Sequence, residues 1–135
     1  MIVRQQDEPP HLGELELAIM EVLWLRSQAT VREVLDGLER APAPGYTTVA
    51  TVLNRLVEKG MLRRTRAGRV DCYHPTCGRE EFDQRKAGAV VRGLVAEYGD
   101  LALAQFATAL EEADPELLTR LRERIAPSGK DDQHA

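Results

Sequence analysis

The sequence TTVATVLNRLVEKG, residues 47–60, decides the fold. Its apolar residues recur at the spacing i, i+3, i+4, i+7 and i+8, which predicts a helix over residues 47–59 with one buried stripe. Gly60 follows the last lysine, and glycine adopts at little cost the left-handed conformation that ends many helices. The buried stripe is expected to hold Val49, Val52, Leu53, Leu56 and Val57.

Two further helices are predicted before residue 47. Residues 12–26 carry apolar side chains on two stripes, so this helix is expected to be buried on two faces. The second helix begins at Thr30-x-x-Glu33, a capping box in which hydroxyl and carboxylate satisfy free backbone amides. Residues 41–45, Ala-Pro-Ala-Pro-Gly, end it because proline has no amide hydrogen. The two stripes of the first helix consist of Leu15, Ala18, Ile19, Val22 and Leu23, and of Leu17, Met20 and Trp24.

A β-hairpin is predicted directly after Gly60. Its strands are expected at residues 62–66 and 69–74, on either side of Ala67-Gly68. Three short helices followed by a hairpin make a winged helix-turn-helix. We therefore assign residues 12–76 to a winged-helix domain.

Residues 77–126 are predicted to form a helical dimerisation domain. Their apolar stripes are narrow, and three thin helices bury too little surface to be stable alone, so a second copy of the chain is expected to complete the core. The alternative is that these helices fold back on their own domain. The helices are expected at residues 79–98, 101–112 and 114–125. The predicted fold is thus mostly α with a small β-hairpin.

Both ends of the chain are polar. Residues 1–11 are predicted to be a flexible tail, and residues 127–135 a disordered one. Residues 1–10 lack the basic flank and apolar stretch of an export signal. No apolar run reaches the roughly 20 residues of a membrane span. We expect a cytoplasmic protein with no membrane partner.

Charge is distributed unevenly along the 135 residues, whose net charge is −4. Residues 54–70 contain six basic side chains and one acidic side chain, whereas residues 77–135 contain eight basic and twelve acidic ones. Such asymmetry orients a protein on a polyanion. It is also compatible with a solvated surface that has no partner.

The polar face of the helix at residues 47–59 has the side chains that read double-stranded DNA. Threonine offers a methyl group to thymine and a hydroxyl to phosphate, and asparagine pairs bidentately with adenine. Arginines of the hairpin are expected either on flanking phosphates or in a narrow minor groove. The candidate DNA-binding residues are Thr47, Thr48, Ala50, Thr51, Asn54, Arg55, Arg64, Arg66 and Arg69. One helix spans few base pairs, so a homodimer on an inverted repeat is expected.

Three motifs carry a resemblance to a known family. They are Leu15-Glu16 through Ile19-Met20 to Leu23-Trp24, then Thr47-Thr48-Val49-x-Thr51-Val52-Leu53-x-Arg55-Leu56-x-x-Lys59-Gly60, and Tyr73-x-Pro75. Together they resemble the BlaI/MecI/CopY family of penicillinase repressors, most strongly over residues 12–75. The resemblance implies a homodimeric winged-helix repressor of β-lactamase or related stress-response genes, bound to operator inverted repeats.

The resemblance also bears on individual positions. Those that match the family's DNA-contacting helix hold Thr48, Thr51 and Arg55. Contact positions that vary within the family hold Thr47, Ala50 and Asn54. Family members often have a tryptophan before this helix, where Gly45-Tyr46 stand here, so this loop is expected to pack differently.

The resemblance further implies a mode of release. In the β-lactamase branch of the family, a membrane sensor triggers cleavage of an Asn-Phe bond in the dimerisation helices. The corresponding pair here is Gln105-Phe106, which makes these residues the candidate cleavage site and a sensor-linked protease a candidate partner. Whether or not the chain is cleaved there, Phe106 is expected to be an aromatic residue of the core.

One short motif contains side chains that bind metals, but a metal site is not expected there. Cys72-x-His74-x-x-Cys77 offers three ligands without a fourth, and the paired Cys-x-Cys motifs of copper-responsive relatives are missing from the sequence. We expect neither metal nor cofactor. Catalytic motifs are also missing, so no enzyme is expected. Two rival functions stay open: a winged-helix regulator released by a small molecule or metal, and a winged helix that binds proteins instead of DNA.

Overall fold

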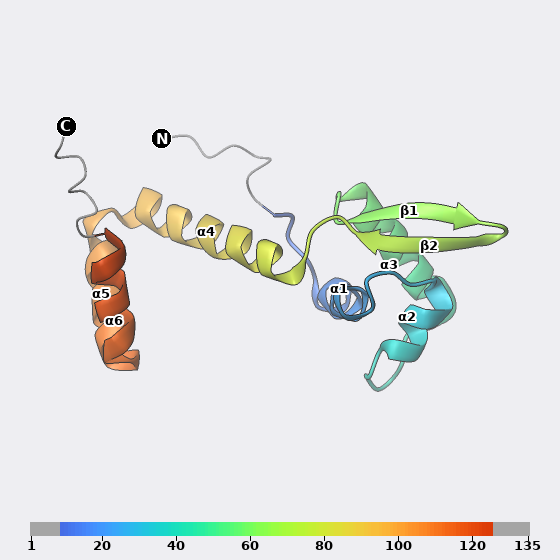
Figure 1. Ribbon diagram of the computed structural model, residues 1–135, viewed down its shortest axis with the longest axis horizontal. Coiled ribbons are helices and arrows are strands. Elements are labelled where there is room, and N and C mark those ends of the chain that lie inside the picture. The colour runs from blue at the N-terminus through green and yellow to red at the C-terminus, as the bar shows by residue number, and fades with distance from the viewer. Residues whose placement is uncertain (1–8, 126–135) are drawn as a thin grey trace. The chain divides into compact units, whose positions relative to one another are not determined.

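The computed structural model describes residues 9–125 (Figure 1). In chain order its elements are α1 (Glu14–Arg26), α2 (Val31–Gly37), α3 (Tyr46–Glu58), β1 (Leu62–Ala67), β2 (Val70–Pro75), α4 (Arg79–Tyr98), α5 (Asp100–Ala113) and α6 (Pro115–Ile125). The predicted fold class, mostly α with one hairpin, is confirmed. The chain divides into two compact units between Ala89 and Val90, within α4. The tail predicted at residues 127–135 lies outside the described residues, as do residues 1–8 of the other tail.

The core of the first unit lies where α1, α2, α3 and the hairpin meet. The expectation that α1 is buried on two faces is confirmed, because Ile19 and Met20, one from each predicted stripe, are both fully buried. Trp24 joins the same core from the second stripe. Its ring centroid lies 5.4 Å from that of Phe82 in α4, and its indole Nε1 donates to the carbonyl oxygen of Cys77 over 2.9 Å.

Local chemistry sets the ends of α2. The predicted capping box is present: the Glu33 amide donates to Thr30 Oγ1 over 3.2 Å, and the Thr30 amide donates to Glu33 Oε1 over 3.0 Å. At the other end, a Cβ on Gly37 would lie 2.9 Å from Cγ1 of Val22. Only glycine therefore lets α2 approach α1 this closely.

The end of α3 leads directly into the hairpin. Gly60 has φ +83°, the left-handed conformation predicted for it. The two strands then pair antiparallel, from Leu62 opposite Pro75 to Ala67 opposite Val70. Tyr73 of β2 also exchanges two backbone hydrogen bonds with Ala29, in the link between α1 and α2. This second pairing attaches the hairpin to the helical core.

The second unit contains the end of α4 together with α5 and α6, which lie side by side (Figure 1). Within the described chain, α5 and α6 have no buried residue. Phe106 is 47% exposed, so its expected burial is not met within one copy. Large apolar side chains left exposed in this unit include Leu94, Tyr98, Leu101, Leu103 and Phe106. As for membranes, none of the helices between residues 9 and 125 combines the length and apolarity that crossing a bilayer requires.

Candidate nucleic-acid interface

One open face of α3 holds four of the predicted DNA-binding residues. The apolar side chains of α3 pack inward, with Val49, Leu53 and Leu56 fully buried, which turns the polar face outward. Together with the first turn of α1 that face lines a groove of about 530 Å³. The four exposed side chains are Thr47, Thr48, Thr51 and Arg55.

The other two predicted residues of α3 lie toward the hairpin. Ala50 and Asn54 are one turn apart and both half-buried. Asn54 Oδ1 accepts a hydrogen bond from the Arg64 guanidinium and another, 3.1 Å long, from the Tyr73 hydroxyl. The structure thus divides the predicted helix residues into an open set and a set beside the hairpin.

The three predicted hairpin arginines are exposed but do not converge on one point. Arg64 contacts Asn54 on α3. Arg66 lies opposite Asp71 in the strand register, with its NH1 3.7 Å from the Asp71 carboxylate. Arg69 follows Gly68 in the turn and lines a recess next to α2 and the start of α3.

Two residues of that recess were not predicted. Tyr46 begins α3 and is 51% exposed. The guanidinium carbon of Arg32, in α2, lies 5.6 Å from the centre of its ring. The sequence signal for Tyr46 was its position one turn before Ala50, on the side of α3 that faces the hairpin.

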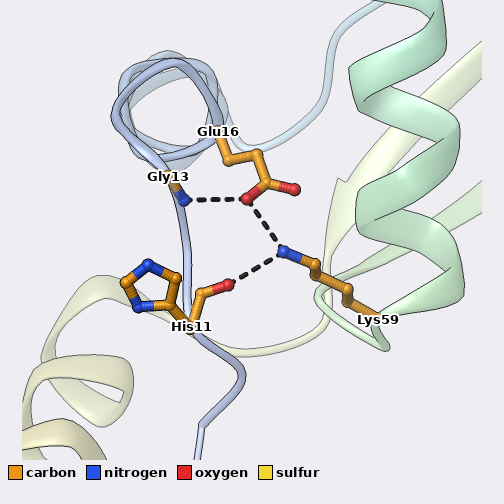
Figure 2. Close-up of polar contacts among 4 residues, drawn as sticks. All are labelled: His11, Gly13, Glu16 and Lys59. Carbon is orange, nitrogen blue, oxygen red and sulfur yellow. Dashed lines mark hydrogen bonds and ion pairs between the residues drawn. The ribbon is translucent and has the colours of Figure 1, made fainter.

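Sequence reasoning also missed a polar cluster that holds α1 against the end of α3. Figure 2 shows the Glu16 carboxylate between the Gly13 amide and the Lys59 ammonium group. Both donate to Oε1 of Glu16 over 2.8 Å, and Lys59 Nζ donates in addition to the carbonyl oxygen of His11 over 2.8 Å. In the sequence Glu16 is recognisable only as part of a motif, and nothing in the local sequence pairs it with a residue 43 positions away.

The environment of Glu16 changes its proton affinity. Only 7% of the residue is exposed, and this burial by itself raises the pKa of the carboxyl. Hydrogen bonds from Lys59 and the Gly13 amide, with the charges of Lys59 and Arg55, outweigh burial, so the pKa of Glu16 lies below its ordinary value. Oε2 of the same carboxylate is buried without a hydrogen-bond partner in the described chain.

The three weighed metal ligands are not brought together. Among residues 9–125, no cluster of three or more histidine, cysteine or acidic side chains is arranged to hold a metal ion. His74 Nε2 lies 2.9 Å from the hydroxyl of Thr65 on the neighbouring strand. Cys77 packs against the core, where burial and then the charge of Glu81 raise the pKa of its thiol.

The candidate cleavage residues are accessible in the single chain. Gln105 and Phe106 are both exposed on α5. They line an apolar groove of about 420 Å³ within the second unit, and the other residues of its wall are Leu94, Tyr98, Leu101 and Ala102.

The order of elements, the open polar face of α3 and the basic hairpin beside it agree with a family comparison. A family described as "Penicillinase repressor" matches residues 12–127. The chain belongs to the penicillinase repressor family. The resemblance found in the sequence motifs is therefore confirmed, and the match extends through the helices of the second unit.

Individual penicillinase repressor relatives match over shorter stretches. The "Transcriptional regulator BlaI" of two Mycobacterium tuberculosis strains, CDC 1551 / Oshkosh and H37Rv, is 43% identical over 72 residues, 53% of this chain and 52% of the relative. The "Penicillinase repressor" of Bacillus licheniformis is 31% identical over 78 residues, 58% of this chain and 61% of the relative. The matches thus span about half of the mycobacterial proteins and three fifths of the Bacillus one.

Two solved structures are also similar to the chain. One is a solution structure of the DNA-binding domain of the repressor BlaI, with a TM-score of 0.48, 31% identity, and coverage of 55% of this chain and 90% of that one. The other is the monomeric form of BlaI from Bacillus licheniformis in complex with the blaP half-operator, with a TM-score of 0.46 and the same identity and coverage.

Proposed function

We propose that the protein is a homodimeric transcriptional repressor that places α3 in the major groove of double-stranded operator DNA. The observation that carries this proposal is the open face of α3, where Thr47, Thr48, Thr51 and Arg55 stand together, while the neighbouring face of the same helix contacts a basic hairpin through Asn54. Threonine methyl and hydroxyl groups suit thymine methyls and base or phosphate oxygens, and an arginine further along suits a phosphate. Arg66 and Arg69 of the hairpin would contact flanking phosphates.

The second unit is proposed to join two copies. A monomer that exposes several large apolar side chains on short helices loses much of the stabilisation that burial provides, about 25 cal/mol for each Å². A second copy of residues 90–125 would cover the apolar groove lined by Leu94 and Phe106. Two α3 helices related by a twofold axis would then select an inverted repeat.

Release from DNA is proposed to follow cleavage in α5. Gln105 and Phe106 occupy the position implied by the family resemblance, and both are exposed in the single chain. A cut there would separate the apolar side chains of α5 that pair two subunits, and the affinity for the full operator would fall because the second half-site is lost. The family and the names of the relatives support β-lactamase or related genes as targets. A sensor-linked protease is the partner proposed to make the cut.

Selection from a random duplex library tests the proposal. The expected product is an inverted repeat whose half-site centres lie about one helical turn, 10–10.5 base pairs, apart. Affinity for that duplex should fall steeply between 50 and 200 mM salt, as counterion release requires. A monomer that enriches no palindrome would overturn the proposal and favour a winged helix that binds proteins.

A further inference from the structure

Asn54 is the predicted base-reading residue whose polar atoms are most restricted by the fold. Its Oδ1 accepts from two donors at once, the Arg64 guanidinium and the Tyr73 hydroxyl. An amide oxygen has two lone pairs, so two donors fill its capacity. Only the NH₂ group of Asn54 is left for another partner.

Bidentate recognition of adenine needs both ends of an asparagine side chain. The amide oxygen must accept from the adenine N6 amino group while the amide nitrogen donates to N7. Because Oδ1 of Asn54 already accepts two hydrogen bonds, this pairing would require at least one of them to break. The geometry therefore disfavours adenine reading at this position.

The hydrogen-bonded group of Tyr73, Asn54 and Arg64 is fixed to the core at Tyr73 and exposed to solvent at Arg64. Tyr73 is 2% exposed, and its backbone is paired with both Arg64 in β1 and Ala29 beyond α1. Its hydroxyl consequently points to Asn54 from a fixed position. Arg64, in contrast, is exposed, and a guanidinium has five N–H donors, so most of them stay available after one hydrogen bond to Asn54.

We propose that Asn54 is a positioning residue that holds Arg64 beside α3 for contact with a DNA phosphate, and that it does not read adenine. This inference rests on the proposed function, since it assumes that α3 lies in the major groove. An arginine held in place before binding loses less conformational freedom when it contacts a phosphate than a freely rotating one. The fixed guanidinium would thereby set the position of the hairpin on the duplex.

Salt dependence of binding to the selected duplex tests the proposal with Asn54→Ala, Arg64→Ala and the double variant. Arg64→Ala should lower the slope of log affinity against log salt by about 1, the loss of one phosphate contact. Asn54→Ala should lower the slope by no more than this, because a freely rotating Arg64 makes the contact less often, and the double variant should match Arg64→Ala. The preference among base pairs should stay as in the unchanged protein. Arg63→Ala, at the neighbouring exposed position of β1, is the matched control, and its effect should add to that of Asn54→Ala.

Amide hydrogen exchange without DNA gives a second measurement that does not depend on duplex binding. Asn54→Ala should speed exchange of the hairpin amides at unchanged thermal stability of the helices, because the link from α3 to the hairpin is removed. Unchanged hairpin exchange would overturn the proposal. So would an Asn54→Ala variant that keeps the salt slope and loses preference at a single base pair. If the unchanged protein binds no duplex, the proposed function itself fails, which is a different result.

Discussion

Lys59 Nζ lies 2.8 Å from Glu16 Oε1, so the residue that ends α3 is held by the first turn of α1. The same ammonium group donates to the backbone of His11, which brings the segment before α1 into the contact. The pair is 43 residues apart in the sequence and fixes where α3 ends relative to the rest of the winged-helix core.

Lys59→Met should destabilise the fold by about 1–3 kcal/mol, because the buried Glu16 carboxylate loses its charged partner. Urea unfolding followed by circular dichroism measures the change. Lys86→Met, on an exposed lysine of α4, is the control and should change the free energy of unfolding by less than about 0.5 kcal/mol. Equal losses in the two variants would contradict a specific role for the Glu16–Lys59 pair.

Acid should weaken the contribution of Glu16. Its pKa in the fold lies below the ordinary value of 4.5, so the ionised carboxylate stabilises the native state above pH 4.5, and this stabilisation is lost as the pH falls through the lower folded-state pKa. The stability difference between the unchanged protein and Glu16→Gln should therefore shrink below pH 4.5. Unfolding free energies at several pH values measure it, and a difference that grows toward acid would contradict this sign.

Thr51→Ala and Arg55→Ala should impair DNA binding in different ways. Loss of the threonine should relax the preference at particular base pairs by about 1–3 kcal/mol, because its methyl and hydroxyl are proposed to touch bases. Loss of the arginine should weaken binding to every duplex and lower the salt slope by about 1. Competition binding with single-base-pair variants of the selected duplex separates the two. Equal losses on all duplexes for both variants would refute the assignment.

Phe106→Glu should convert the proposed dimer to monomers, since a charge on the apolar groove of the second unit would have to be buried without a partner. Sedimentation equilibrium measures the change. Thr108→Glu, two residues further along α5 and also exposed, is the control for helix stability. A Phe106→Glu variant that still sediments as a dimer would place the subunit contact elsewhere.

Gly60→Ala should cost about 1–2 kcal/mol of stability, because alanine is strained at φ +83°. A Cβ at this position has no atom within 4 Å, so the loss reports backbone strain without a steric clash. Gly60→Asn should lose less, since asparagine tolerates the left-handed conformation. Thermal unfolding compares the stability of the two variants. An equal loss of stability in both would argue against backbone strain as the cause.

The sequence predicted the structural features that depend on residues close together in the chain. The helix at residues 47–59, the Thr30 capping box and the hairpin follow from periodicity, capping chemistry and turn residues, all within a few positions. The two hydrogen bonds that Asn54 Oδ1 accepts from Tyr73 and Arg64 could not be predicted from the sequence, because they depend on how α3 packs against the hairpin. Lys59 was likewise assigned to a helix end, while its partner Glu16 becomes visible only in three dimensions.

The sequence predicted the positions of the helices better than the exposure of individual side chains. The α3 helix begins at Tyr46, one residue before the predicted start, because Gly45 in extended conformation precedes the first turn. Phe106 is exposed in the single chain although an aromatic in an apolar stripe is expected in a core. Periodicity identifies which face of a helix is apolar, but it does not say whether the same chain or another copy covers that face.

The attachment of β2 to Ala29 leaves β1 as the outer strand of the hairpin. An outer strand presents unpaired backbone groups that invite strands of other molecules and so promote aggregation. Three of the six residues of β1 are arginines, and all three are exposed: Arg63, Arg64 and Arg66. Their mutual repulsion between molecules opposes edge-to-edge stacking, so the basic side chains of β1, two of which are proposed to meet DNA, should also help to keep the protein from self-associating through its hairpin.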